Sequence, residues 1–283
     1  MAHKFLVSTL ATAVALSISA TAMAKDMGKV ERNFEQITVI GSQQAINDIP
    51  GSATFISDAE LQKFEFTDIS RVLASVPGVY VQEEDGYGLR PNIGMRGTGT
   101  GRNDKISVME DGVLVAPAPY SAPSAYYFPT MGRMESIEVL KGAASVKYGP
   151  RTTGGVLNLL SRSLPTEPNS STGMLDAALG SDGYYKGHAY FAKEKNNTAG
   201  LIEVFTYGAD GFKDLPVGDD NTGFEKTDLL LKLGHTFGKN DAHNLELKIK
   251  YSDETSDETY MGLTDADYQA TPYRRYAASQ NDE

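Results

Sequence analysis

The sequence predicts an α+β domain followed by the first antiparallel strands of a membrane β-barrel. Helix and strand signals are mixed between residues 45 and 165, whereas later segments alternate polar and apolar residues with a period of two. Short turns and long polar loops connect these later segments in turn, as they do in outer-membrane barrels. A soluble β-sandwich gives similar alternation, and a secretory signal at the N-terminus is what favours the barrel.

The first 24 residues have the three parts of a secretory signal. Lys4 supplies the positive charge, residues 5–20 are apolar, and Ala22-Met23-Ala24 has the small-residue pattern of a cleavage site. We therefore expect cleavage near Ala24 and a mature chain that lies beyond an inner membrane. Residues 25–34 are polar and without periodicity, which predicts a flexible tether. The chain has no cysteine, so disulfides and thiolate metal ligands are excluded.

Short helices and strands are predicted in the α+β domain. Strands are expected at 53–56, 79–82, 105–110, 113–115, 136–140 and 155–160, with helices after Ser57 and Thr67 and a small-residue turn or helix at 142–149. Ser57 and Glu60 form a capping box, and Asp111-Gly112 is a strong hairpin-turn signal. The glycine-rich residues 94–102 have the wrong spacing for a phosphate loop and are predicted to form a mobile loop between strands.

About five strands are predicted between residue 166 and residue 256. The clearest is 244–252, in which Leu245, Leu247, Ile249 and Tyr251 share one face. Leu230 and Glu203 are exceptions to the alternation of their own strands. Five strands cannot close a barrel in lipid, because their edges would leave backbone groups unsatisfied. We therefore expect an incomplete barrel and a chain that is a fragment or a truncated gene product.

Charge and motif content exclude several functions. The net charge is −11, which argues against a nucleic-acid partner, but residues 85–162 carry 9 basic and 6 acidic side chains. This locally positive segment suits an anionic ligand. The histidines are scattered without metal-ligand spacing, and no nucleophile elbow is present, so no enzyme activity, cofactor or direct metal site is expected.

Five motifs in register resemble a TonB-dependent outer-membrane receptor. They are VPGVYVQ at 76–82, GMRG at 94–97, VMEDGVLV at 108–115, ESIEVLKGAASVKYG at 135–149 and TTGGVLNLLSR at 152–162. Before them, EQITVIGS at 35–42 has the composition of a short apolar strand with no partner nearby, so we expect an exposed, unpaired strand. It resembles a TonB box, which offers its free edge to a partner strand. APAPYSAP (116–123) and the end of the domain look most like the ferric dicitrate receptor branch. The resemblance divides the chain into a signal (1–24), a periplasmic tether with the TonB box (25–44), a plug domain (45–165) and barrel strands (166–283).

The resemblance implies a barrel of about 22 strands that the plug fills. It also implies uptake of a ferric chelate into the periplasm across the outer membrane of a Gram-negative bacterium, with lipid around the barrel and a periplasmic N-terminus. The inner-membrane TonB complex would bind Glu35, Gln36, Ile37, Thr38, Val39, Ile40 and Gly41. Three plug loops, 83–92, 98–105 and 117–127, would meet an Fe(III) chelate through Arg90, Arg102, Lys105, Tyr120, Tyr126 and Tyr127. Arg96 and Arg133 are candidates for ion pairs between plug and barrel.

Two departures from the ferric dicitrate pattern narrow the expectation. Only ten residues, 25–34, separate the expected cleavage site from Glu35, so we do not expect gene-regulatory signalling through a folded domain before the TonB box. Ala122-Pro123-Ser124 stands where glutamines flank the proline in citrate-binding members, which puts citrate in doubt as the chelator. A small structural or adhesin barrel with a soluble head is the alternative, as is an inactive truncated receptor.

Overall fold

The computed structural model describes residues 37–115, 127–215, 222–257 and 262–275. The predicted signal and tether, together with Glu35, Gln36, Tyr120 and Tyr126, lie outside these residues. Within the described ranges, no helix is long and apolar enough to span a membrane.

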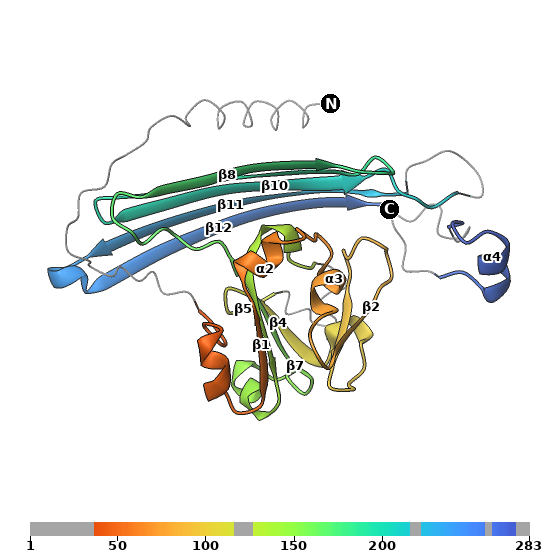
Figure 1. Ribbon diagram of the computed structural model, residues 1–283, viewed down its shortest axis with the longest axis horizontal. Coiled ribbons are helices and arrows are strands. Elements are labelled where there is room, and N and C mark those ends of the chain that lie inside the picture. The colour runs from red at the N-terminus through yellow and green to blue at the C-terminus, as the bar shows by residue number, and fades with distance from the viewer. Residues whose placement is uncertain (1–36, 116–126, 216–221, 258–261, 276–283) are drawn as a thin grey trace. The chain divides into compact units, whose positions relative to one another are not determined.

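The first part of the described chain forms the expected α+β domain (Figure 1). Its elements are η1 (Gln44–Asp48), β1 (Ser52–Ile56), α2 (Asp58–Gln62), α3 (Ile69–Leu73), β2 (Val79–Gln82), β3 (Asn92–Met95), η2 (Gly101–Asn103), β4 (Ile106–Glu110), β5 (Val113–Leu114), η4 (Met131–Arg133), β6 (Met134–Lys141), η5 (Ala143–Tyr148) and β7 (Gly155–Ser161). The capping box at α2 and the Asp111-Gly112 turn between β4 and β5 are both present, and the turn residues have positive φ angles of 51° and 75°.

A mixed five-stranded sheet is the centre of this domain, in the order β1-β6-β7-β4-β5. β4 pairs with β7 in parallel, and the other neighbours are antiparallel. One face carries the main core, in which Ile137, Val139 and Leu157 pack against α3 and the β2–β3 hairpin. The opposite face carries a smaller cluster, in which Leu140 and Val156 pack against residues from the N-terminal segment.

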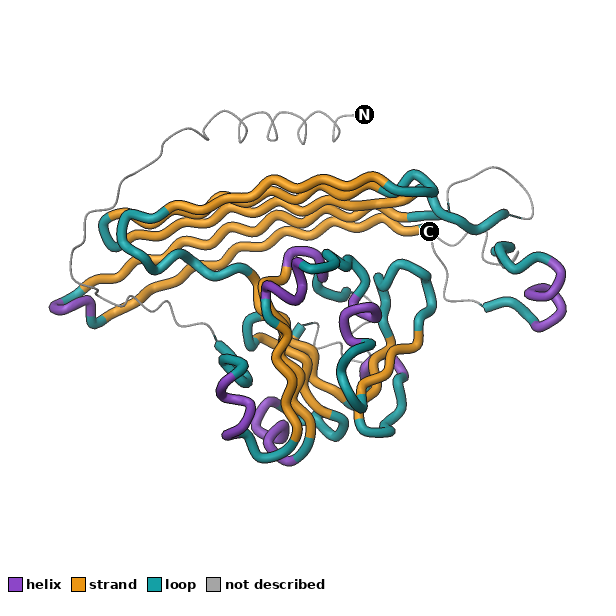
Figure 2. The backbone as a smooth tube through the Cα atoms, viewed as in Figure 1, coloured by secondary structure: helices purple, strands orange, loops and turns teal. Residues whose placement is uncertain are grey.

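The second part of the chain is an antiparallel sheet of five long strands (Figure 2). These are β8 (Ser171–Leu179), β9 (Tyr185–Lys195), β10 (Thr198–Ala209), β11 (Phe224–Phe237) and β12 (His243–Ser256), joined in chain order. The number of strands matches the prediction. Among the described residues, β8 and β12 each have one hydrogen-bonded neighbour, so the sheet is open. Two further short elements, η6 (Lys239–Asp241) and α4 (Asp265–Ala270), lie before and after β12.

The two faces of this sheet differ as the alternation predicts. Leu245, Leu247, Ile249 and Tyr251 of β12 are all more than half exposed. The other face is buried against the α+β domain, and on β11 it presents Lys226, Asp228, Leu230 and Lys232. The two exceptions to the predicted alternation belong to this inner face: Leu230 packs with Leu164 and Leu201, and Glu203 is 1% exposed.

Three local predictions are wrong. The glycine-rich stretch does not begin as a loop, because Gly94 belongs to β3 and faces Tyr80 across the hairpin, where a Cβ would overlap the Tyr80 ring. The cap of α3 is Asp68 rather than Thr67, since its carboxylate accepts the Ser70 N–H at 2.8 Å. The third concerns residues 37–41, which form no strand and in which Val39 and Ile40 are buried.

Candidate functional site: the docked N-terminal segment and the buried charges

Residues 37–41, which we call the coupling segment, lie against the second face of the mixed sheet. Val39 and Ile40 are each only 8% exposed and pack with Met109, Leu140 and Val156. Ile37 is 59% exposed, although its side chain contacts the turn at Gly112, where a Cβ would overlap it. The coupling segment is therefore docked, and the prediction of a free, unpaired strand is corrected.

One buried carboxylate holds the coupling segment through its backbone. Glu138 Oε2 accepts the Val39 N–H at 2.6 Å, and Oε1 accepts the N–H groups of Ile40 at 2.9 Å and Gly41 at 2.6 Å. The Tyr148 hydroxyl donates to the Val39 carbonyl at 3.1 Å. Hydrogen bonds to an ionised acceptor are roughly twice as strong as neutral ones. Three consecutive backbone donors are thus occupied by a side chain rather than by another strand.

The sheet register explains why Glu138 occupies a buried position. Glu138 of β6 lies directly opposite Asn158 of β7, and both are 0% exposed. Asn158 Nδ2 donates to Glu138 Oε2 at 2.8 Å, while its Oδ1 accepts the Gly112 N–H at 2.9 Å. A buried charge persists only where hydrogen bonds compensate its lost hydration. The sequence signal for this pair is a single polar residue within each of the apolar stretches IEVL (137–140) and VLNLL (156–160).

Glu138→Gln should loosen the coupling segment. The amide has one acceptor oxygen instead of two and turns an N–H₂ group toward backbone donors, so we expect a cost of about 1–3 kcal/mol in docking. Since the chain has no cysteine, a nitroxide on Ile37→Cys gives a single labelled site. Its electron paramagnetic resonance spectrum should sharpen in Glu138→Gln.

Glu135→Gln is the matched control for this measurement. Glu135 is also on β6, but its carboxylate accepts from the backbone and hydroxyl of Ser163, at 3.0 and 2.7 Å. The spectrum of the label should not change in this variant. Equal mobility in the Glu138→Gln and unaltered proteins would remove Glu138 from the role assigned to it.

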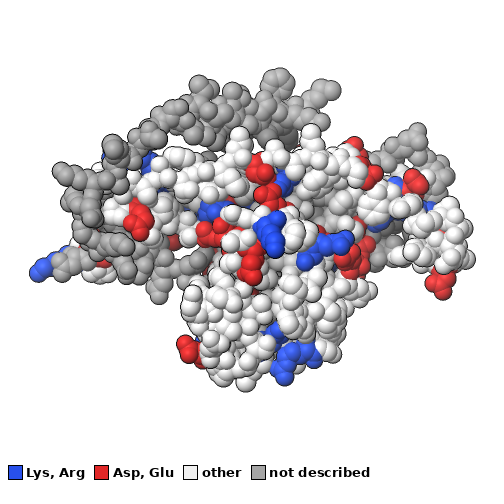
Figure 3. Space-filling model, viewed as in Figure 1, with Lys and Arg blue, Asp and Glu red and all other residues white. Residues whose placement is uncertain are grey.

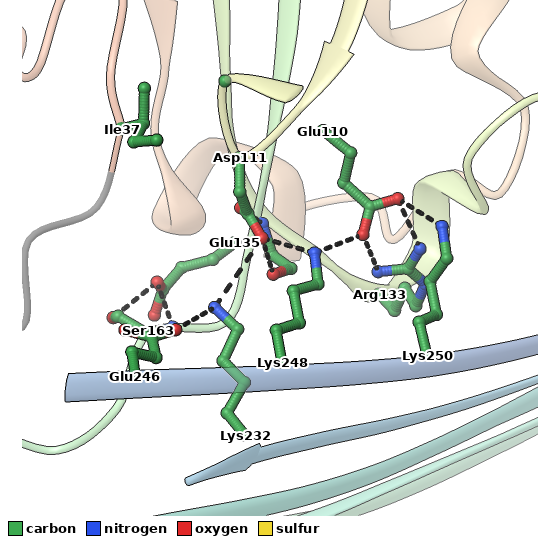
Figure 4. A network of polar contacts seen from close by, with 12 residues as sticks. Ile37, Glu110, Asp111, Arg133, Glu135, Ser163, Lys232, Glu246, Lys248 and Lys250 are labelled. Carbon is green, nitrogen blue, oxygen red and sulfur yellow. Dashed lines mark hydrogen bonds and ion pairs between the residues drawn. The ribbon is translucent and has the colours of Figure 1, made fainter. Parts of the chain in front are cut away.

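A second polar cluster joins the α+β domain to the inner face of the long strands (Figure 4). Arg133 is 0% exposed; its Nη1 and Nη2 donate to the two Glu110 oxygens at 3.1 and 2.9 Å, and its Nε donates to Asp228 of β11 at 2.6 Å. Lys248 and Lys250 extend from β12 to Glu110, at 2.7 and 2.8 Å. The prediction that Arg133 forms an ion pair with the barrel strands is confirmed.

The charges of this cluster keep its acids ionised. Burial alone would raise the pKa of Glu110, but Arg133, Lys250 and Lys248 outweigh it and hold that pKa well below its usual range. The pKa of Asp111 is also lowered, because Lys232, Lys248 and Ser161 together outweigh its burial. Despite its own burial, the pKa of Arg133 is raised by Glu110 and Asp228. Figure 3 shows acidic and basic side chains side by side between the long strands and the α+β domain.

The structure places the predicted ligand-binding cations in pairs with carboxylates. Arg90 contacts Glu254 of β12 at 2.6 Å, Arg102 contacts Glu84 at 2.6 Å, and Lys105 contacts its neighbour Asp104 at 2.8 Å. The Arg102 pair joins loop 98–105 to loop 83–92. Half of the Lys105 side chain remains exposed. An anionic ligand would compete with these carboxylates for the cations.

A carboxylate that sequence reasoning missed organises loop 83–92. Asp85 accepts the N–H groups of Tyr87 and Gly88 through Oδ1 and of Arg90 through Oδ2, at 2.6–2.8 Å. Asp85 is 6% exposed, so this arrangement fixes the loop from within. The sequence EEDGYG offered a weak signal for it, since aspartate before glycine often bonds to its own turn.

Of the three predicted tyrosines, only Tyr127 lies within the described residues, and it contacts cations of the strands. Lys250 donates to its hydroxyl at 2.7 Å and lies 4.6 Å from its ring centroid, and Lys226 lies 5.3 Å from the centroid. Arg96, the other predicted ion-pair partner, has no carboxylate within 4.0 Å among the described residues. The plug–barrel ion pair of Arg96 therefore stays a prediction; in the structure Arg96 lines a cleft at the end of the β2–β3 hairpin.

Comparison with protein families decides the identity of the α+β domain. Residues 45–156 match the TonB-dependent Receptor Plug Domain family. The chain carries a TonB-dependent receptor plug domain. Its coupling segment immediately precedes this plug domain, and the five long strands follow it, as in the family arrangement that the sequence motifs resemble.

Curated relatives include a transporter and an outer membrane virulence protein. The chain is 27% identical over 252 residues to a vitamin B12 transporter BtuB from Photobacterium profundum, covering 87% of this chain and 40% of that protein. It is 30% identical over 161 residues to an iron-regulated outer membrane virulence protein of Vibrio cholerae. This match covers 54% of this chain and 24% of that protein. The chain thus spans less than half the length of the curated relatives it matches.

Solved structures share the fold at lower identity. The ferric citrate transporter FecA in its unliganded form superposes with a TM-score of 0.69 at 23% identity, over 83% of this chain and 36% of FecA. The ferric yersiniabactin uptake receptor FyuA from Yersinia pestis superposes with a TM-score of 0.56 at 21% identity, over 72% of this chain and 31% of FyuA. The plug with the antiparallel strands that follow it is therefore the fold of this receptor family.

Proposed function

We propose that this chain forms the plug and the first wall strands of an outer-membrane transporter that takes up a ferric chelate into the periplasm. The TonB complex would supply the energy through the coupling segment and the preceding Glu35 and Gln36. The observation that carries the proposal is the docked coupling segment, whose backbone donors are held by Glu138 on the plug. A partner strand that pairs with this segment would need N–H groups of the same three residues.

Docking and strand pairing exclude each other at these donors. A partner strand that pairs with residues 37–41 must take over N–H groups that Glu138 now accepts, so the segment has to leave the plug first. Burial of Val39 and Ile40 opposes this release by about 1.5–3 kcal/mol for each side chain. If the undocked state is populated at a fraction f, the apparent dissociation constant of the partner rises by 1/f. Release of the segment would therefore control coupling.

The proposed ligand is an anionic iron chelate, and loops 83–92 and 98–105 would bind it. Arg90, Arg102 and Lys105 supply the positive charge. The bound chelate would displace the carboxylates of the plug and of β12 that now contact these cations. In a partly buried site an ion pair about 4 Å apart gains roughly 4 kcal/mol, against about 1 kcal/mol in water. Tyr127, together with Tyr120 and Tyr126, would add aromatic surface. The loops that contact the chelate would determine its specificity, for ferric dicitrate or for another ferric siderophore.

Reversing the charge of Arg102 and Lys105 together should weaken capture of an anionic chelate. Two attractive pairs become repulsive, so we expect the dissociation constant to rise at least about tenfold, the equivalent of ~1.4 kcal/mol. Binding of radioactive ferric chelate to whole cells measures this. Arg71→Glu, on the exposed face of α3, is the control and should bind normally. Unchanged affinity in the double variant would remove these loops from the ligand site.

Uptake by cells tests the proposal as a whole. Cells that carry the gene should accumulate radioactive iron from at least one ferric chelate in a panel, and a deletion strain should not. Accumulation should stop when the membrane is de-energised, while surface binding continues. Identical growth of both strains on every chelate in the panel would contradict the proposal of iron uptake.

A further inference from the structure

The exposed face of the long strands has a gap between side chains near one end of the sheet. The outward residues of β10 are small there, Thr198 and Gly200, and the only atom within 4 Å of a Cβ at Gly200 would belong to a leucine side chain at 3.6 Å. Thr198 pairs with Lys195 of β9 on one side and with His235 of β11 on the other. Since neighbouring strands lie about 4.8 Å apart, the gap between β9 and β11 is about 10 Å wide.

Two exposed lysines of β9 border this gap. Lys193 lies opposite Gly200, and Lys195 lies opposite Thr198. Residues two apart on a strand point to the same face and are about 7 Å apart, so the two ammonium groups can reach one anion. On the other side of β9, Lys193 pairs with Ser171 of β8. The strands on both sides of β9 therefore place uncharged residues opposite the lysines.

Aromatic rings border the gap on its other side and hold an imidazole in place. Thr198 Oγ1 contacts Nδ1 of His235 at 2.9 Å, which leaves Nε2 for a ligand. The His235 ring stacks on Phe237, with centroids 5.9 Å apart, and Phe237 contacts the ring of His243 on β12 at 5.4 Å. The imidazole is thus fixed from two directions at the edge of the gap.

The charges of the exposed face are divided between its two ends. The lysines lie next to the two-residue turn 196–197, whereas the outward carboxylates Glu225 and Asp253 lie at the opposite end of β11 and β12. The longest connection between the five strands, residues 210–223, is also at that opposite end. Because outer-membrane barrels have short turns on the periplasmic side and longer loops outside, the gap belongs to the periplasmic end.

We propose that this gap binds the headgroup of an anionic phospholipid from the membrane leaflet on the periplasmic side. The phosphate would lie over Gly200 and Thr198, between the two lysine ammonium groups and Nε2 of His235. Lysines at the membrane surface attract anionic lipids, and aromatic rings suit the boundary between polar and apolar layers. Phe191 and Leu233, the next outward residues along β9 and β11, are 38% and 45% exposed and would contact the acyl chains. This lipid site goes beyond the proposed iron uptake and does not depend on it.

Fluorescence quenching by lipid tests the proposal on the folded full chain. The sequence has no tryptophan, so Phe237→Trp places a single fluorophore beside the gap. The protein is inserted into phosphatidylcholine vesicles that contain an equal, minor fraction of either brominated phosphatidylglycerol or brominated phosphatidylcholine. Bromine quenches on contact, so the two quenching curves give the relative association constant of the two lipids at the gap. We expect a preference of at least about fivefold for phosphatidylglycerol, as one lysine near an anionic headgroup already provides.

Three variants, each made with the tryptophan present, separate charge from shape. Lys193→Gln with Lys195→Gln should lower the preference below about twofold, because the attraction to the headgroup is lost. Gly200→Leu keeps both lysines but fills the gap from an outward position that has room for a Cβ, and it should lower the preference equally. Lys63→Gln with Lys147→Gln removes the same charge from exposed positions on the plug and should leave the preference unchanged. Circular dichroism checks that each variant is folded.

Every outcome supports or overturns the lipid site. Equal quenching by the two brominated lipids would overturn it, as would a preference that persists in the double lysine variant or in Gly200→Leu. Sodium glycerol phosphate should displace phosphatidylglycerol no better than sodium chloride at matched ionic strength. Stronger displacement would assign the gap to free phosphate compounds and contradict the lipid assignment. Iron uptake has no part in any readout, so failure here leaves the proposed function standing.

Discussion

Proline at Val39 should abolish energised iron uptake while ligand binding at the cell surface persists. Proline removes the N–H that a partner strand needs and fixes the φ angle near −65°. The same N–H is the one that Glu138 Oε2 accepts at 2.6 Å, so the variant also loosens docking. Proline at Ile37 should have the same effect on uptake. We expect accumulation to fall to the level of de-energised cells.

Gln43→Pro is the matched control for this result. Gln43 lies two residues beyond the coupling segment, and its φ angle of −57° already suits proline. Uptake should therefore continue in this variant, which separates loss of pairing from a general effect of proline near the plug. Unimpaired uptake in Val39→Pro would contradict the assignment of residues 35–41 as the TonB-binding segment.

Val39→Pro and Glu138→Gln should differ in a further way. Both loosen the segment, but only Glu138→Gln leaves every backbone donor available to a partner strand. We therefore expect Glu138→Gln to bind the partner more tightly than the unaltered protein, and Val39→Pro to bind it less. The two variants thus separate release of the segment from its capture.

Arg133→Met should strongly lower the free energy of unfolding. It removes the guanidinium between Glu110 and Asp228, and breaking a buried ion pair by deleting one partner costs about 3–5 kcal/mol. Lys248 and Lys250 still contact Glu110, so we expect a value near the lower end, about 3 kcal/mol. Urea unfolding followed by circular dichroism measures the change in free energy.

Two comparisons give this measurement its control. Arg71→Met removes an exposed guanidinium and should change stability by no more than about 0.5 kcal/mol. A double-mutant cycle of Arg133→Met with Asp228→Asn should give a coupling of about 0.5–3 kcal/mol, since the two residues are in contact. Additive effects in this cycle would show that the Arg133–Asp228 contact contributes nothing to holding the plug against β11.

The same cluster sets the response to acid. Because the pKa of Glu110 is lowered in the folded state, its contribution is fully present above the ordinary carboxyl pKa of 4.5 and is lost only as the pH falls through the lowered value. Arg133→Met brings the pKa of Glu110 back toward its ordinary value. Acid unfolding of this variant should therefore begin at a higher pH than that of the unaltered protein.

The strands were predictable because alternation is a local property. Leu245, Leu247, Ile249 and Tyr251 could be assigned to one face from spacing alone, and their exposure agrees. Glu203 was an exception only while its surroundings were unknown. In the structure its carboxylate contacts His188 at 2.8 Å and lies 3.6 Å from Nε of Arg162, which follows β7, so the exception marks contact with the plug.

The docked coupling segment could not be predicted in this way. Its docking depends on Glu138 and Asn158 meeting across β6 and β7, and that meeting depends on strand register between segments 20 residues apart. From the sequence alone, the apolar residues of EQITVIGS predict an exposed strand that pairs with a partner. Val39 and Ile40 instead cover an apolar face that the plug already has.

The position of β1 at the edge of the mixed sheet has a mechanical consequence. A pull on the coupling segment would first meet η1, whose Ala45 and Ile46 pack on the plug, and would then reach Ser52, the first residue of β1. Among the described residues β1 has β6 as its one hydrogen-bonded neighbour. Lifting Ser52 therefore meets the five cross-strand pairs in succession, from Ser52–Lys141 to Ile56–Ile137, and not all at once. Each step gives up about 0.5–1.5 kcal/mol per hydrogen bond, so a modest force sustained over distance peels β1 away while the interior pairs of β6, β7 and β4 stay closed.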